Sequence, residues 1–217
     1  MNQKYKQFID LLDKEDKDNS VLYIHKLLEE GRSIVEIYQD FLIPSLADYE
    51  CDSNHEEICI WREHTRTSII RTILESTYPY LIKAQKEKPI DKYIVMACPQ
   101  EEYHEIGAII SINYFYLMGY KVKYIGANTP NKEVQSALKI MKPDYLALSI
   151  SNYYNLIQTK RLLEEIKADG TDVKIILGGQ AAIKHAKKLK LPFDYILNTY
   201  EDIKNFRGDD QWNSPLT

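Results

Sequence analysis

The chain has 217 residues, 44% hydrophobic and 28% charged, with a formal net charge of −4 at pH 7. This composition is typical of a globular protein with one large domain or two modest ones, and its small negative charge gives no general attraction to nucleic acid or to an anionic membrane. No apolar run is long enough to span a bilayer, and the first residues lack the apolar core of a secretory signal. With only three cysteines, at no framework spacing, we expect a cytoplasmic protein in a reducing compartment.

Residues 1–88 predict a helical bundle, because apolar residues recur at helical spacing along most of this part. The segments with this pattern are residues 4–12, 21–30, 33–49 and 56–85. Ser53 and Glu56 form a capping-box pattern, so the last helix should begin there, and Pro79 should kink or end it. The apolar residues available for its buried face are Ile58, Ile60, Trp61, Ile69, Ile70, Ile73 and Leu74.

Residues 89–217 show a different pattern, in which short β-rich runs alternate with helical segments. The expected strands are residues 92–98, 121–126, 144–151, 173–179 and 193–198, and the expected helices are residues 107–119, 131–142, 155–169 and 181–190. This alternation predicts an α/β domain with a five-stranded parallel sheet, doubly wound in the flavodoxin-like order 2-1-3-4-5. Residues 207–217 predict a loosely ordered tail.

Ligands of such sheets bind beyond the carboxyl ends of the strands, where the strand order reverses. Unusual residues lie after the first strand, at the end of the third and after the fourth, and these three strands are neighbours in this order. They are Glu102, His104 and Gly107, then Ser149 and Ser151, then Gly178 and Gly179. The loop after the second strand, residues 126–130, falls on the far side of the first strand and predicts an ordinary helix entry.

The first of these loops has the chemistry of a metal-ligand site. A neutral imidazole at His104 offers a lone pair to a metal, and Glu102, two residues earlier, can accept the other ring N–H and fix the tautomer. Gly107 lets a bulky ligand approach the backbone, and the small residues of the other two loops leave a slot for a flat or elongated group. The loop lacks the glycine-rich turn of a dinucleotide site, and its acids would repel phosphate.

The spacing of these residues resembles that of the corrinoid-binding domains, which carry Asp-x-His-x-x-Gly, Ser-x-Leu and Gly-Gly at matching intervals. In this chain 41 residues separate Gly107 from Ser149, and 26 separate Ser151 from Gly178. Glu102 replaces the family's aspartate, and Ser151 replaces its leucine. The resemblance implies base-off, His-on cobalamin, with His104 as the cobalt ligand and the nucleotide tail in the slot. The cofactor-binding residues that it implies here are Glu102, His104, Glu105, Ile106, Gly107, Ser149, Ser151, Gly178 and Gly179.

The helical part resembles the cap of the light-responsive cobalamin regulators of the MerR-type class. Their cap carries a Trp, nine residues and Glu-His, followed by Thr and Arg on the same helix; here Glu63-His64 precedes Thr65, Thr67 and Arg71. Ser53 occupies the Trp position. The resemblance implies that Ile60, Glu63 and His64 face the upper side of the cofactor, whose form (adenosyl-, methyl- or hydroxocobalamin) the sequence leaves open. We expect their DNA-binding domain to be absent, because the bundle begins within the first residues.

These features favour a cobalamin-binding sensor, rather than an enzyme, whose cofactor state is detected by a partner protein, with a homo-oligomer as a further possibility. An alternative is the corrinoid methyl carrier of a methyltransferase system, which has the same layout; another is a degenerate module that binds only protein. Taken singly, His104 also fits a surface histidine and Gly178-Gly179 a helix entry. A soft-metal site of Cys51, His55, Cys59 and His64 is less favoured, since the helix start at Ser53 separates Cys51 from the others.

Overall fold

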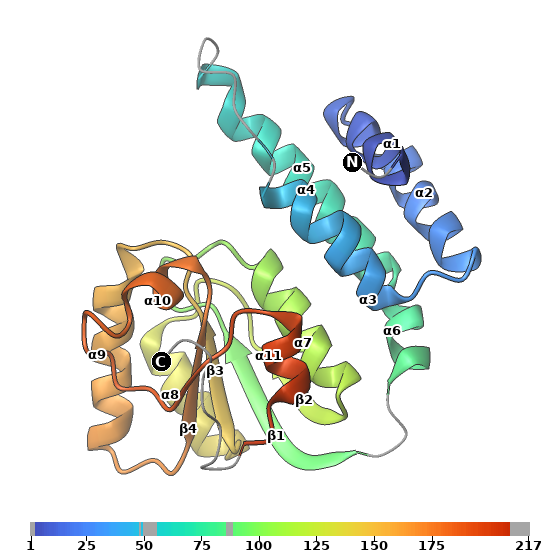
Figure 1. The fold of residues 1–217 in the computed structure, drawn as a ribbon. Helices are drawn as coiled ribbons and strands as arrows, with labels where there is room; N and C mark the ends of the chain where they lie inside the picture. The colour runs from blue at the N-terminus through green and yellow to red at the C-terminus, as the bar shows by residue number, and fades with distance from the viewer. Residues whose placement is uncertain (1–2, 48, 50–55, 86–88, 209–217) are drawn as a thin grey trace. The chain divides into compact units, whose positions relative to one another are not determined.

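The computed structural model describes residues 3–47, 49, 56–85 and 89–208. The chain divides into two compact units, Met1–Ala84 and Gln85–Thr217, whereas we expected the boundary between residues 88 and 89 (Figure 1). Among the residues that the structure describes, no helix combines the length and the apolar character needed to cross a membrane.

The first unit consists of helices over its described residues (Figure 1). They are α1 (Gln3–Asp13), α2 (Lys17–Glu29), α3 (Ile34–Ile37), the π-helix η1 (Tyr38–Leu42), α4 (Ile43–Ala47), α5 (Glu56–Ser76) and α6 (Tyr78–Ala84). Phe8 and Phe41, from α1 and η1, pack edge to face in the core and are fully buried. Ser33 caps α3 through a reciprocal pair of bonds with Glu36, which satisfies backbone N–H groups at the helix start.

Two helices of this unit are interrupted at prolines. The helix expected over residues 33–49 contains a π-turn, in which the Ile43 N–H bonds to the Tyr38 carbonyl, five residues earlier. Pro44 explains this turn, because its ring cannot donate to the helix and crowds the preceding turn. The predicted interruption near Pro79 is confirmed, since α5 ends at Ser76 and α6 begins at Tyr78.

The expected buried face of α5 is only partly correct. Ile69, Ile70, Ile73 and Leu74 are buried. Ile60 and Trp61 are 67% and 48% exposed, so their predicted burial is wrong. Among the side chains of α5 that the structure describes, which begin at Ile60, those of residues 60–64 are all exposed and burial starts at Arg66. Ile58 lies outside the residues whose side chains the structure describes.

The second unit is the predicted α/β domain. Its strands are β1 (Ile90–Ala97), β2 (Tyr120–Tyr124), β3 (Tyr145–Ser149), β4 (Lys174–Gly178) and β5 (Tyr195–Ile196). Its helices are α7 (Ile106–Leu117), α8 (Asn131–Met141), α9 (Asn155–Ala168), α10 (Gln180–His185) and α11 (Tyr200–Asn205). All strand pairs are parallel, in the order β2-β1-β3-β4-β5, which confirms the predicted topology.

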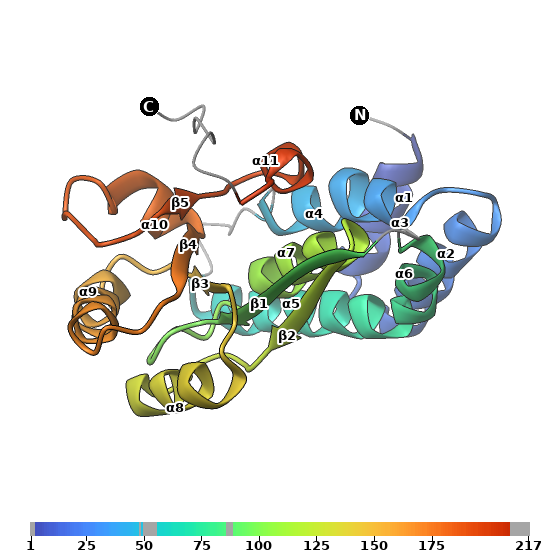
Figure 2. The same ribbon diagram turned by 90° about the horizontal axis from the view of Figure 1, so that it is seen from below.

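Helices cover both faces of this sheet, with α7 and α11 on one face and α8, α9 and α10 on the other (Figure 2). The central strand β3 is buried along its whole length, as expected for a parallel sheet covered on both sides. Helix α11 was not predicted. Its start has a local signal that we did not use, a capping box between Thr199 and Asp202. The helix leads to Phe206, whose carbonyl accepts a bond from the Tyr120 hydroxyl at 3.0 Å.

Candidate functional site

The loops after β1, β3 and β4 begin side by side at the carboxyl edge of the sheet. The strand register pairs Ala97 with Leu148 and Ser149 with Gly178, so the ends of these three strands are neighbours. The predicted residues of the second unit lie at these ends or in the loops that follow them. This edge is therefore the candidate site.

Glu102 is the buried centre of the site. Its side chain has no exposed surface, and it accepts five hydrogen bonds from groups on two loops. One oxygen, Oε1, accepts from the His104 ring Nδ1 at 2.6 Å and from the His104 backbone N–H at 3.1 Å. The other, Oε2, accepts from the backbone N–H groups of Ser151 and Asn152, at 2.9 and 2.8 Å, and from the Asn155 side chain at 3.1 Å. Glu102 thus joins the loop after β1 to the loop after β3.

These bonds decide the charge of Glu102 and the tautomer of His104. Burial by itself would raise the pKa of Glu102, but the hydrogen bonds from Asn152, His104 and Asn155 outweigh burial and lower this pKa. An ionised carboxylate can only accept, so the proton of a neutral His104 ring lies on Nδ1 and the lone pair on Nε2. The side chain is 61% exposed, and Nε2 makes no hydrogen bond to any residue that the structure describes. His104 can therefore give one nitrogen to a metal.

Open space lies beside Gly107, one helical turn after His104. A Cβ placed at Gly107 would meet no atom within 4 Å. The preceding side chain, Ile106, is buried in the domain. A bulky group can therefore approach the start of α7 next to the exposed imidazole. One free imidazole nitrogen beside open space fits a metal whose other ligands come with a flat cofactor.

Gly178, which ends β4, and Gly179, which follows it, also serve the packing of the protein itself. A Cβ at Gly179 would lie 2.4 Å from the Ile150 carbonyl oxygen, and φ is +87° there, so glycine is required on both grounds. A Cβ at Gly178 would lie 3.2 Å from the Leu197 carbonyl oxygen. At Gly179, then, the missing side chain accommodates the backbone of the neighbouring loop after β3. Ser149, at the end of β3, is 8% exposed.

A model of the B12 binding domain matches residues 93–203, just over half of the chain. The chain belongs to the B12-binding domain family. This confirms the family predicted from the motif spacing, and the cofactor of this B12-binding domain is a cobalamin.

One curated relative is the HTH-type transcriptional repressor CarA of Myxococcus xanthus, which is 27% identical over 169 residues, or 76% of this chain. The match covers 56% of CarA, so the chain spans about half the length of that relative. The monomethylamine corrinoid protein of Methanosarcina barkeri has the same fold, with a TM-score of 0.79 and 15% identity over 93% of this chain and 95% of that one. The match to a cobalamin-binding protein of Desulfitobacterium hafniense DCB-2 covers 92% of this chain and 95% of that protein's chain, with 16% identity and a TM-score of 0.48.

Several residues of the B12-binding domain site were missed from the sequence. Asn152 and Asn155 follow the predicted Ser151, and Asn155, which begins α9, is 4% exposed because its amide bonds to Glu102 and to the Glu101 carbonyl. The polar run in this loop was the available signal. Its pairing with Glu102 depends on how far each loop extends beyond its strand, which local sequence does not specify.

The loop after β2 makes contacts that were not predicted. Residues 126–130 lead into α8, and β2 lies on the far side of β1 from β3, as expected, but the loop also bonds to the His104 loop. The Asn128 side chain accepts from the Glu101 N–H at 2.8 Å, and the Asn128 N–H donates to the Glu102 carbonyl at 2.9 Å. Because β2 is the direct neighbour of β1 in the sheet, these two loops begin side by side.

Another missed residue is Tyr124, the last residue of β2. Its hydroxyl donates to Glu105 Oε2 at 2.7 Å and lies 3.7 Å from the Cys98 Sγ. Burial raises the pKa of Tyr124, as does the bond to Glu105, so the hydroxyl stays a donor. Burial also raises the pKa of the Cys98 thiol, to about 12, which keeps it protonated.

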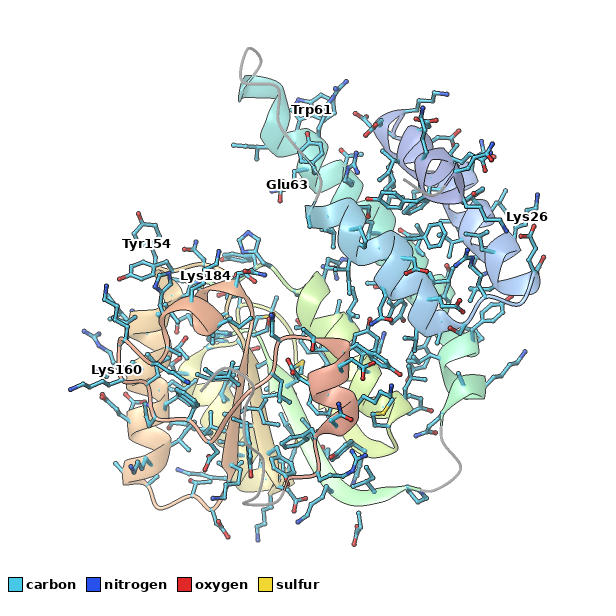
Figure 3. The ribbon with its side chains drawn as sticks, viewed as in Figure 1. Lys26, Trp61, Glu63, Tyr154, Lys160 and Lys184 are labelled. Carbon is cyan, nitrogen blue, oxygen red and sulfur yellow. The ribbon has the colours of Figure 1, made fainter. Side chains whose placement is uncertain are left out.

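The other predicted site residues lie in α5 of the helical unit. Ile60, Glu63 and His64 are exposed there, and Figure 3 shows Glu63 and Trp61 on the first turns of this helix. Ser53, together with Cys51 and His55, lies outside the described residues. Among the residues that are described, no three His, Cys, Asp or Glu side chains form a metal-binding group.

Proposed function

We propose that this protein binds cobalamin in the base-off, His-on state and serves as a sensor whose helical unit responds to the state of the cofactor. One observation carries the first part of this proposal. Glu102 holds Nδ1 of His104 at 2.6 Å, while the ring stays 61% exposed. This arrangement supplies an oriented lone pair at Nε2, as an axial ligand requires.

The residues of the sheet unit have separate tasks in this proposal. Glu102 holds the His104 ring and its tautomer, and Asn155 with the Ser151 backbone keeps Glu102 ionised and fixed. Gly107 leaves room for the corrin ring, and Ser149, Gly178 and Gly179 border the entry of the nucleotide tail. When bound, cobalamin would supply a cobalt centre with an exchangeable ligand.

The sensing role rests on the helical unit. Ile60, Glu63 and His64 share one exposed stretch of α5, so an apolar side chain and two polar ones are available to cover the upper ligand. The similarity to a transcriptional repressor over 76% of this chain supports regulation as the purpose. A partner protein, or a second copy of the chain, would then respond to the change in the cofactor.

Electron paramagnetic resonance of the cob(II)alamin complex tests the ligation directly. A ¹⁴N axial ligand splits the signal into triplets, and a ¹⁵N ligand into doublets. We expect doublets when uniformly ¹⁵N-labelled protein binds unlabelled cob(II)alamin, and loss of this pattern in His104→Ala. His25→Ala is the matched control, because His25 bonds to Ser76 within the helical unit. Triplets in the labelled protein would mean that the benzimidazole of the cofactor stays on the cobalt, and base-off binding would be wrong.

A corrinoid methyl carrier is the second candidate, favoured by the fold shared with the monomethylamine corrinoid protein over 93% of this chain. Size-exclusion chromatography with adenosyl- and methylcobalamin, in the dark and after illumination, separates the two functions. A light-dependent change of size with adenosylcobalamin alone supports the sensor. Equal, light-independent behaviour with both forms favours the carrier.

A further inference from the structure

Glu105 is held by a strand that takes no part in the Glu102 network. Glu105 precedes α7 as its N-cap residue, yet its side chain makes no capping bond to the helix. Instead its carboxylate accepts from the Tyr124 hydroxyl at 2.7 Å, across from β1 to the end of β2. Glutamate is not among the residues that usually cap a helix N-terminus. The bond between Glu105 and Tyr124 ties the start of α7 to the end of β2.

The His104 residue is consequently fixed from both sides of β1. On the β3 side, Glu102 accepts from the His104 ring and from its backbone N–H. At the end of β1, the His104 carbonyl accepts from the Cys98 thiol at 3.8 Å, and on the β2 side the next residue, Glu105, is tied to Tyr124. The first set of bonds fixes the ring, and the second fixes the peptide that carries it.

We propose that Tyr124 is a positioning residue for the cobalt ligand: its hydroxyl anchors Glu105 to β2, so that His104 is in place before the cofactor arrives. This inference rests on the proposed His-on ligation. It deepens that function by adding a second support for the ligand, on the opposite side from Glu102. Without the hydroxyl, residues 103–106 gain conformational freedom in the free protein, and binding must then order them.

Tyr124→Phe removes this one hydroxyl and keeps the ring. We expect its affinity for hydroxocobalamin, followed by visible absorbance, to fall about tenfold, the lower end of the range for residues that orient a metal ligand through another group. In the cofactor-free protein, hydrogen exchange at residues 102–106 should become faster. The ¹⁵N splitting of bound cob(II)alamin should weaken, which a change in overall stability alone would not cause.

Matched variants separate positioning from other effects. Tyr93→Phe also removes a tyrosine hydroxyl, one that contacts Met141 Sδ at 3.5 Å near the opposite end of the sheet, and should change none of these readouts. Glu105→Gln keeps a carbonyl acceptor for Tyr124 and should lose less affinity for hydroxocobalamin than Glu105→Ala does. Glu105→Ala removes the acceptor of the same bond. The double variant Glu105→Ala, Tyr124→Phe should lose no more affinity for hydroxocobalamin than Glu105→Ala alone.

Unchanged affinity and unchanged hydrogen exchange in Tyr124→Phe overturn the inference, and so do losses that simply add in the double variant. If the His104→Ala spectrum loses its nitrogen splitting while Tyr124→Phe behaves as wild type, ligation stands and only the role of Tyr124 falls. If His104→Ala keeps the wild-type spectrum, the proposed function fails, and this inference fails with it.

Discussion

Glu102→Gln is the most informative change at this site, because it replaces one oxygen of a fully buried carboxylate by an amide NH₂. The three donors of the β3 loop all converge on Oε2, so the remaining amide oxygen should occupy that place. The NH₂ group then faces His104, whose Nδ1 must accept instead of donate. The neutral ring then carries its proton on Nε2, and this nitrogen no longer has a lone pair to give to a metal.

The size of the effect follows from the bonds that change. The His104 backbone N–H loses its acceptor and the Oε2 bonds lose their charge assistance, while the cost of burying an ion disappears. The net loss in the free energy of unfolding should be about 2 kcal/mol. Affinity for cobalamin should fall about 10- to 100-fold, which corresponds to about 1.4–2.7 kcal/mol.

Nitrogen NMR of the cofactor-free protein measures the tautomer, since protonated and unprotonated ring nitrogens have well-separated ¹⁵N shifts. We expect a protonated Nδ1 in the wild type and a protonated Nε2 in Glu102→Gln. Glu101→Gln is the control, because it removes the same charge from an exposed side chain one residue away. A wild-type ring with its proton on Nε2, or unchanged cobalamin affinity in Glu102→Gln, would refute the reasoning.

Three further predictions concern other parts of the sheet unit. Gly179→Ala should lower the free energy of unfolding by about 3 kcal/mol in urea denaturation, because its Cβ would lie 2.4 Å from the Ile150 carbonyl oxygen at a φ of +87°. Gly107→Val should leave the stability of the cofactor-free protein within about 1 kcal/mol, since its Cβ meets no atom within 4 Å, but should weaken cobalamin binding about tenfold in an absorbance titration. Asp144→Asn should destabilise the protein modestly at pH 7, on the order of 0.5 kcal/mol, and the difference should vanish in acid. Burial alone would raise the pKa of Asp144, but bonds led by that from Lys92 lower this pKa below its usual value. A lowered folded-state pKa gives stability that is present above the unfolded-state pKa and is lost as the pH falls through the folded-state pKa.

Controls make these three outcomes decisive. Gly31 also has a positive φ, +95°, but a Cβ there would meet no atom within 4 Å, so Gly31→Ala isolates the backbone cost of about 1 kcal/mol. Equal losses at Gly31 and Gly179 would show that the contact with Ile150 costs nothing. Normal cobalamin affinity in Gly107→Val would place the corrin elsewhere. If the difference in the free energy of unfolding between Asp144→Asn and wild type stayed constant down to about pH 3, the titration of Asp144 would be excluded as its cause.

Local patterns predicted most of the fold. The alternation of β-rich runs and helical segments after residue 89 predicted five parallel strands and their order, because a right-handed crossover leaves few arrangements of such a chain. The break at Pro79 also followed from the residue itself, since proline removes a helix donor. The burial of Ile60 and Trp61 was mispredicted from the same kind of pattern. An apolar residue on a helix is buried only where another element packs against it.

The sequence by itself indicated roughly where the strands end and which chemistry follows them, so the position of Glu102, His104 and Gly107 after β1 was predictable, and their part in cofactor binding stays a prediction. The tertiary structure alone decided their partners. Asn155 reaches Glu102 from 53 residues away, and Tyr124 reaches Glu105 from 19. Such pairs depend on the register of neighbouring strands and on the path of each loop beyond its strand. Both are set by the packing of the whole sheet, which is why no local pattern contains them.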